Sequence, residues 1–261
     1  MNKVVWITVL DKEKDQDQAK KLYQMVSSYG LAAAGHFWRD NLFKMSWAEG
    51  REDLVKKETA LWIIVGSAEI LAKEDIRYGL SMLALGVFAQ KGQGFPILVA
   101  TTGGEVKAES LPTPLKGADV LAAAGAGLGP KIVAKANMPI KNPPLEYRLD
   151  VYGMEGIGQW FEVGPAAKHS WNGVMFGVSN GEISVHGVGP SSRLPERSVV
   201  EYAMKGLKLQ LGETEYTAWA VKNQLATADS YYLKVKDYPK SIVFGPLGEG
   251  DDAEVFVVHL K

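Results

Sequence analysis

The sequence has no cysteine, no long apolar run and almost no net charge, and each absence removes a class of protein. Without cysteine there are no disulfides, no thiolate nucleophile and no Cys-ligated zinc or iron–sulfur site. No stretch approaches the ~20 apolar residues of a membrane helix. A net charge of −1 provides no basic face for nucleic acid. We therefore expect a cytoplasmic protein with neither a nucleic-acid nor a membrane partner.

The 261 residues that are present suit two domains, and the pattern changes once along the chain. The change falls at Lys141-Asn142-Pro143-Pro144, where two prolines interrupt the pattern. Strand and helix patterns alternate before this point, and helical periodicity nearly vanishes after it. The sequence predicts an α/β domain over residues 1–140 and an all-β domain over residues 145–261.

The first domain is organised around Ala60–Val65, six apolar residues that stop at Gly66. A short, continuous and β-branched run predicts a strand buried on both faces of a parallel sheet. Other strands are predicted at residues 4–10, 31–37, 95–101 and 119–123, with helical patterns between them. This alternation predicts a three-layer, flavodoxin-like fold.

Helix boundaries in this half follow from capping residues and proline. Asp15 or Asp17 is expected to cap the first helix, and Gly30 to end it. A long helix is predicted over about residues 73–90; Gly79 and Gly86 inside it indicate close packing, because each glycine costs roughly 1 kcal/mol relative to alanine. Residues 130–136 are expected to form a helical turn with proline in first position.

The second half contains seven or eight short alternating runs separated by Gly, Pro and Asp turns. Asn180-Gly181 lies between two such runs, and an Asn-Gly pair in this position is typical of a β-hairpin. The pattern predicts an antiparallel sandwich or jelly roll.

The motifs of the first half resemble those of Toll/interleukin-1 receptor (TIR) domains. The segments that carry the resemblance are WITVLDKEKD, GLAAAGHFWRD, LWIIVGSAEILAKEDI, FPILVATTG and LPTPL. The resemblance implies a third strand that ends at a serine, here Ser67. TIR enzymes that cleave NAD use a glutamate on the following helix, and the position that aligns with it is about Gly79. Glu74 lies one to two turns earlier and Glu69 lies in the loop, so these two are the candidate catalytic residues.

A ligand site is expected where the parallel strands end, since ligands of open α/β sheets bind outside the carboxyl ends of strands. The residues expected there are Asp11, Asp40, Gly66, Ser67 and Gly103. Reachable amides at the glycines, the serine hydroxyl and nearby carboxylates favour the ribose of a nucleotide-type ligand such as NAD. A shallow, solvated groove is the alternative.

Other polar clusters have a chemical and a structural interpretation. Residues 124–130 are rich in glycine, but their GxGxG spacing after the last strand favours a flexible loop over a phosphate cradle. His36 and Asp40 suit acid–base chemistry, although Trp38 between them favours packing. A triad or metal site could be composed of His169, Ser170, His186 and Glu162, but isolated histidines on strands are usually solvated or hydrogen-bonded, and we expect that here.

The aromatic residues of the second half also have two interpretations, a flat platform for a sugar or the core of a sandwich. They are Trp160, Trp171, Trp219, Tyr231 and Tyr232. No two histidines have the i, i+4 spacing of a helical metal pair, so neither a metal nor a tightly bound cofactor is expected.

Three functions remain open from the sequence. The first is a two-domain sensor or signalling protein that binds a nucleotide-type ligand in its α/β half. The second is a structural or interaction module, and the third is a NAD- or nucleotide-cleaving hydrolase that uses Glu69 or Glu74. Homo-oligomerisation is left open.

Overall fold

The computed structural model describes residues 3–248 and 254–261 as two compact units. The first unit holds residues 1–42 and 46–143, and the second holds residues 43–45 and 144–261. The division thus falls between Pro143 and Pro144, with one three-residue loop segment of the first half grouped with the second unit. Among the described residues, no helix has both the length and the apolar character that a membrane span requires.

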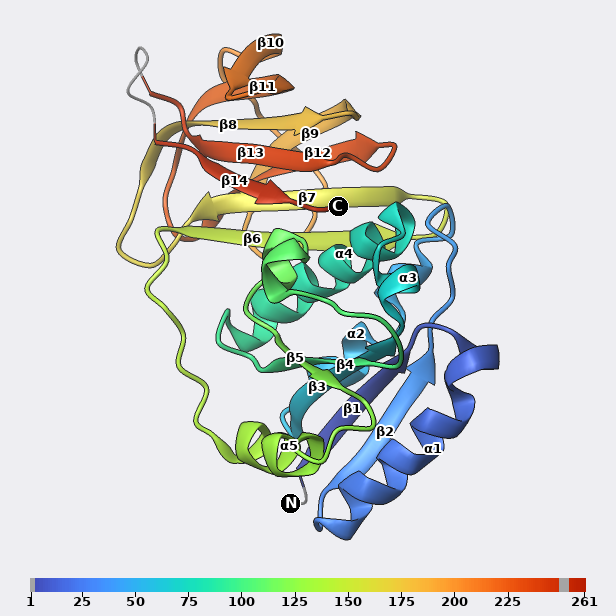
Figure 1. The fold of residues 1–261 in the computed structure, drawn as a ribbon. Coiled ribbons are helices and arrows are strands. Elements are labelled where there is room, and N and C mark those ends of the chain that lie inside the picture. Colours follow the sequence, from blue (N-terminus) through green and yellow to red (C-terminus); the bar gives the residue numbers. More distant parts are fainter. Residues whose placement is uncertain (1–2, 249–253) are drawn as a thin grey trace. The chain divides into compact units, whose positions relative to one another are not determined.

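The first unit is a parallel α/β fold, as predicted (Figure 1). Its strands are β1 (Val4–Val9), β2 (Ala32–Phe37), β3 (Thr59–Gly66), β4 (Ile97–Thr101) and β5 (Asp119–Ala122). Its helices are α1 (Lys12–Ser28), α2 (Arg51–Leu54), α3 (Ala68–Leu71), α4 (Glu74–Lys91) and α5 (Leu128–Asn137). All four strand pairs are parallel and the strand order is β2-β1-β3-β4-β5, the order of flavodoxin-like folds.

Helices cover both faces of this sheet (Figure 1). On one face α1 and α5 pack on alternate residues of β1 and β3 such as Val5, Ile7 and Ile63. The central strand β3 is buried on both faces, and Trp62, Ile63 and Ile64 have no exposed surface, which confirms the prediction. The Trp62 indole also donates a buried hydrogen bond to the hydroxyl of Thr8 in β1, at 2.9 Å.

The glycines of α4 pack as predicted. A Cβ atom on Gly79 would lie 2.7 Å from Cζ2 of Trp38, and a Cβ on Gly86 would lie 2.9 Å from Cζ of Arg51. Gly30 has a φ of +75° just beyond the end of α1, where only glycine is comfortable.

Two helix starts differ from the predictions. Asp11, rather than Asp15 or Asp17, caps α1, because its carboxylate accepts hydrogen bonds from the amides of Glu13 and Lys14. Only Leu10 and the capping Asp11 therefore separate the end of β1 from the start of α1. Pro130 is the third residue of α5 rather than the first, and it remains within the first turn, where proline removes no helical hydrogen bond.

The second unit is an antiparallel β-sandwich, as predicted, with no helix among its described residues. Its strands are β6 (Tyr147–Met154), β7 (Gly158–Pro165), β8 (Trp171–Ser179), β9 (Glu182–Pro190), β10 (Met204–Leu211), β11 (Thr214–Leu225), β12 (Asp229–Lys236), β13 (Ser241–Pro246) and β14 (Phe256–His259). One sheet has the order β10-β11-β8-β13-β14 and the other β6-β7-β12-β9. Phe161 of β7 and Phe176 of β8 meet between the sheets, with ring centroids 5.4 Å apart.

The predicted hairpin at Asn180-Gly181 is wrong. Asn180 has a φ of +56° and does reverse the chain, but β8 and β9 enter different sheets. β8 pairs with β11 and β13, while β9 pairs with β12. The turn therefore links the two layers of the sandwich.

Candidate functional site

The four predicted strand ends do lie side by side along one edge of the parallel sheet. Since β2, β1, β3 and β4 are consecutive and parallel, the segments after them emerge at the same edge. Chain order reverses between β1 and β3, which makes this the topological switch point of the sheet. Asp11 follows β1 and Ser67 follows β3, so these two residues flank it.

Several polar groups at this edge already have partners. The Ser67 hydroxyl accepts a hydrogen bond from the amide of Ile70 at 3.3 Å and caps α3. The carbonyl of Gly103 accepts from the amide of Ala68 at 2.7 Å, and the carbonyl of Gly66 accepts from the amide of Thr102 at 3.1 Å. These hydrogen bonds connect the loop between β3 and α3 to the loop after β4, so they have a structural role.

Space at the switch point is uneven. A Cβ on Gly66 would lie 2.9 Å from both Leu10 Cδ1 and Ile70 Cγ2, so aliphatic side chains cover the end of β3. Gly103 has nothing within 4 Å of its Cβ position and is open. Partial burial and the negative charge of Asp75 raise the pKa of Asp40, which Lys73 offsets in part.

Both candidate catalytic glutamates are exposed to solvent. Glu69 belongs to the four-residue helix α3, and Glu74 is the first residue of α4. Neither lines the three pockets described below. Their catalytic role therefore stays a prediction.

His36 is enclosed by tryptophans rather than paired with Asp40. Its Nδ1 accepts a hydrogen bond from the indole of Trp6 at 3.1 Å, and its ring lies 6.5 Å from that of Trp38. Burial lowers its pKa; the negative charge of Asp53 opposes this in part, and the positive charge of Arg39 adds to the lowering. This environment indicates a packed, neutral histidine.

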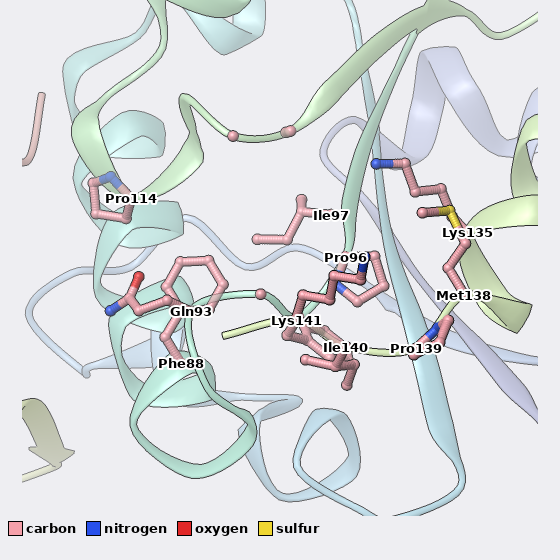
Figure 2. A pocket seen from close by; sticks show the side chains of 14 residues that line it. Phe88, Gln93, Pro96, Ile97, Pro114, Lys135, Met138, Pro139, Ile140 and Lys141 are labelled. Atoms are coloured by element: carbon pink, nitrogen blue, oxygen red, sulfur yellow. The ribbon is translucent and has the colours of Figure 1, made fainter. Parts of the chain in front are cut away.

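A pocket of about 230 Å³ lies elsewhere in this unit, at the end of the sheet where β4 begins (Figure 2). Figure 2 shows Phe88 and Gln93 on one side and Lys135, Met138 and Pro139 on the other, with Ile97, Ile140 and Lys141 between them. We call it the β4 pocket; its lining residues are Phe88, Gln93, Gly94, Phe95, Pro96, Ile97, Pro114, Gly117, Ala118, Lys135, Met138, Pro139, Ile140 and Lys141. Most of its lining residues are apolar, but polar atoms account for almost half of its exposed surface, and its charged lining residues are Lys135 and Lys141.

The charges around the β4 pocket are predominantly positive. Lys131 and Lys135 both bind the carboxylate of Asp119, at 2.9 and 2.5 Å. Burial opposes ionisation of Asp119, but hydrogen bonds from Lys135 and Lys131 outweigh it and lower its pKa. One carboxylate thus faces two ammonium groups, and Lys141 adds a further positive charge.

One wall of the β4 pocket is the segment that leads toward Pro143. The side-chain carbonyl of Asn142 accepts a hydrogen bond from the amide of Gly94 at 2.8 Å. A Cβ on Gly92 would lie 2.2 Å from Asn142 Oδ1, and a Cβ on Gly94 would lie 2.2 Å from the carbonyl of Lys141. Only glycines at these two positions allow the segment to dock this closely.

Sequence analysis did not find the β4 pocket because its residues come from four separate segments. The available signal was weak: Lys131, Lys135 and Lys141 lie close together in a stretch with Pro139 and few acidic residues.

In the second unit, the four residues considered as a triad or metal site, His169, Ser170, His186 and Glu162, do not come together. Glu162 and His186 lie on opposite faces of one sheet, because Glu162 pairs with Tyr232 and His186 bonds to Tyr231. His169 and Ser170 instead line a separate pocket of about 350 Å³, together with Glu146 and Glu254.

Glu162 is the centre of a buried polar network, with only 3% of its side chain exposed. Its carboxylate accepts hydrogen bonds from Tyr152 Oη at 2.5 Å, Ser230 Oγ at 2.7 Å and the amide of Ser192 at 2.8 Å. Arg148 contributes a longer contact of 3.4 Å. The network fastens the loop after β9 to the four-stranded sheet.

The aromatic residues of this unit do not form one platform. Tyr231 shares the inner face with Phe161, whereas Tyr232 shares the outer face with Trp160, since alternate residues of a strand point to opposite faces. Tyr231 and Tyr232 have no exposed surface, and Trp171 has 5%. They fill space within the fold.

Fold and site together define a two-domain protein: a flavodoxin-like α/β unit with a small positive pocket, followed by an antiparallel β-sandwich. A scan against protein-family models and a search of the curated proteins find no match.

Solved structures similar to this chain include two crystal structures of a two-domain esterase (CEX) active on acetylated mannans, one of them co-crystallised with mannopentaose. Sequence identities are 10% for the co-crystallised form and 9% for the other, and each similarity covers 99% of this chain and 90% of the esterase chain. Both TM-scores are 0.28, a value too low to support a statement about the fold or activity of this chain.

Proposed function

We propose that this chain is a two-domain binding protein of the sensor type, in which the α/β unit binds a small organic anion in the β4 pocket. The observation that supports this most is the composition of that pocket, with mostly apolar lining residues and lysine as its charged lining. A ligand with an apolar body and one carboxylate satisfies both features. The all-β unit then serves a second recognition function.

The pocket suits binding better than catalysis. Lysine, glutamine and backbone groups are its polar lining, and none of them forms a nucleophile–base pair of the kind that covalent catalysis requires. Because Lys141 lines the pocket and the neighbouring Asn142 accepts a hydrogen bond from the amide of Gly94, a bound ligand would also stabilise the segment that leads toward Pro143. Such a link between pocket and segment is what a sensor needs.

Thermal denaturation with short fatty acids, aromatic carboxylates and inorganic phosphate tests this proposal. A ligand at 100 times its dissociation constant adds ~2.7 kcal/mol to the free energy of unfolding. Gly117→Leu is the blocking variant, because Gly117 lines the pocket and its Cβ position has nothing within 4 Å. A carboxylate that stabilises the wild type and not this variant supports the proposal. The absence of any stabilisation by these compounds would reject it.

A nucleotide-type ligand at the carboxyl edge is the second candidate, supported by the switch point between β1 and β3. Gly103→Leu blocks that edge as Gly117→Leu blocks the pocket, since its Cβ position is equally open. Each variant is therefore the control for the other. If the carboxyl edge is the nucleotide site, calorimetric titration with NAD and ATP should show binding heat in the wild type and in Gly117→Leu, and none in Gly103→Leu.

The TIR resemblance adds NAD cleavage as a reaction to assay. In that case Glu74→Gln or Glu69→Gln should abolish release of nicotinamide from NAD, while Gly117→Leu leaves it intact. An equal rate in the wild type and Glu74→Gln assigns no catalytic role to this residue.

A further inference from the structure

The outer strand β2 has a free edge with main-chain groups available for pairing. The amides of Ala32 and Trp38 bond to the carbonyls of Lys3 and Val9, so even-numbered residues face β1. The amides and carbonyls of Ala33, Gly35 and Phe37 therefore point outward, because these groups alternate along a strand. Within residues 3–248 and 254–261, no strand pairs with this side of β2.

This edge lacks the features that usually protect an outer strand. Natural proteins place charged residues, proline or bulges on exposed edges to prevent pairing with other chains. The sequence of β2 is AAAGHF, with no Lys, Arg, Asp, Glu or Pro. It is regularly paired to β1 over six consecutive residues, with no register shift. An unprotected regular edge is a site for strand addition.

A groove of about 420 Å³ runs beside the same edge, between β2 and α1. Its apolar lining includes Val9, Ala19 and Phe37. Gly35 is one of the lining residues; a Cβ there would lie 1.9 Å from the carbonyl oxygen of Ile7 in β1 and 2.9 Å from the hydroxyl of Tyr23 in α1, so only glycine fits at this position. The residues with outward main-chain groups are thus the ones whose side chains face α1. A strand added to β2 would direct alternate side chains into the groove.

The charge of the groove restricts the occupant. Lys20 supplies the ammonium group in its lining, which also contains Gln16, Gln24 and His36 and includes no Asp or Glu. Its ion pair with Asp17 is largely exposed and so contributes little. The ammonium group of Lys12 lies 5.5 Å from the ring of Phe37 at one end. Positive charge along an apolar groove matches a segment that carries an acidic residue.

A second copy of this chain fits less well. Pairing of two β2 strands about a twofold axis at Gly35 keeps both α1 helices on one face of the joined sheet. The two Lys20 side chains would then approach each other, and like charges in contact disfavour association. The charge argument therefore favours a different partner chain.

We propose that β2 and the adjoining groove bind an extended segment of a partner protein by β-augmentation. The segment pairs with the outward groups of Ala33, Gly35 and Phe37, places one apolar side chain in the groove and sets an acidic residue opposite Lys20. This interaction surface is separate from the β4 pocket and does not depend on it.

Selection from a library of blocked nonapeptides on the immobilised full-length chain tests the proposal. We expect enriched peptides to alternate apolar and polar residues and to carry Asp or Glu. Affinity should fall about tenfold in Ala33→Pro, which removes an outward amide without touching the bonds to β1. Lys20→Glu should reverse the preference to Lys or Arg. Lys21→Glu, an exposed charge on α1 outside the groove, should change neither.

Two results would overturn the proposal. One is a library without enrichment, or with enriched peptides that bind all variants equally well. The other is a wild-type chain that dimerises by light scattering and becomes monomeric in Ala33→Pro, which assigns the edge to a second copy. Because Lys20→Glu alters a solvent-exposed side chain, it reports on binding even if Ala33→Pro fails to fold.

Discussion

At the scale of single residues, the two glycines of α4 show how one missing methyl group positions an element. Trp38 packs against Gly79 and Arg51 packs against Gly86, at distances that leave no room for a Cβ atom. The obstacles differ, since an indole ring held in the core cannot move aside whereas a guanidinium on a long chain can. The same substitution should therefore have different effects at the two positions.

Gly79→Ala should destabilise the protein by about 1–3 kcal/mol, the usual cost of overpacking. Gly86→Ala should be neutral or stabilising by up to about 1 kcal/mol, because the gain in helix propensity is not cancelled. Urea denaturation of the two variants, both within one helix, measures the difference. Equal losses would show that Arg51 is held as rigidly as Trp38.

Glu162→Ala should cost about 3 kcal/mol, because it leaves the buried donors of Ser230, Tyr152 and the Ser192 amide without an acceptor. The lower end of the known range applies, since the Arg148 side chain is 28% exposed. Glu182→Ala is the control, because its exposed pair with Lys236 should contribute less than about 1 kcal/mol. Similar losses in both variants would argue against a stabilising role for the network.

At the scale of elements, sequence patterns predicted which segments become strands and helices better than how these segments pair. Burial of Trp62 and the positive φ of Gly30 follow from local composition and were predicted. The destination of β9 was not, because Asn180-Gly181 specifies a chain reversal and says nothing about which sheet receives the next strand. The β4 pocket also depends on contacts between distant segments, which no local pattern encodes. By contrast, the carboxyl edge was predictable, since parallel strands must end together.

The start of α1 gives a test at this scale. Asp11→Ala should cost about 1 kcal/mol, the typical loss when an N-cap side chain is removed. Asp17→Ala should change the free energy of unfolding by less than about 0.5 kcal/mol, since its carboxylate forms only an exposed pair with Lys20. Chemical denaturation measures both changes in the free energy of unfolding. A larger loss in Asp17→Ala than in Asp11→Ala would show that Asp11 is not the residue that caps α1.

At the scale of the whole molecule, each unit contains one histidine with a lowered pKa. Burial is the main cause for both His36 and His186, and the positive charge of Lys205 adds to it for His186. Both imidazoles thus resist protonation in the folded chain, whereas in the unfolded chain they take up a proton near the ordinary value of 6.5. Acidification therefore favours unfolding of both units.

We expect full stability above about pH 6.5 and a progressive loss as the pH falls below it. Denaturation midpoints between about pH 7.5 and pH 5.5 measure this slope, at values where most carboxylates remain ionised. A variant with glutamine at both positions 36 and 186 should show a flatter profile over that range. An unchanged slope in that variant would assign the pH dependence to other groups.

The sheet-crossing turn at Asn180-Gly181 also determines when each half can fold as the chain is synthesised. β8 ends at Ser179 and its neighbours are β11, which begins at Thr214, and β13, which begins at Ser241. The five-stranded sheet therefore cannot be completed until β13 and β14 (Phe256–His259) have left the ribosome. In the first half, β1 and β2 pair across a single helix, so those contacts close over short loops. The α/β unit should therefore fold first, while strands of the β-sandwich stay unpaired and exposed to aggregation until their later partners, β11, β13 and β14, have been synthesised.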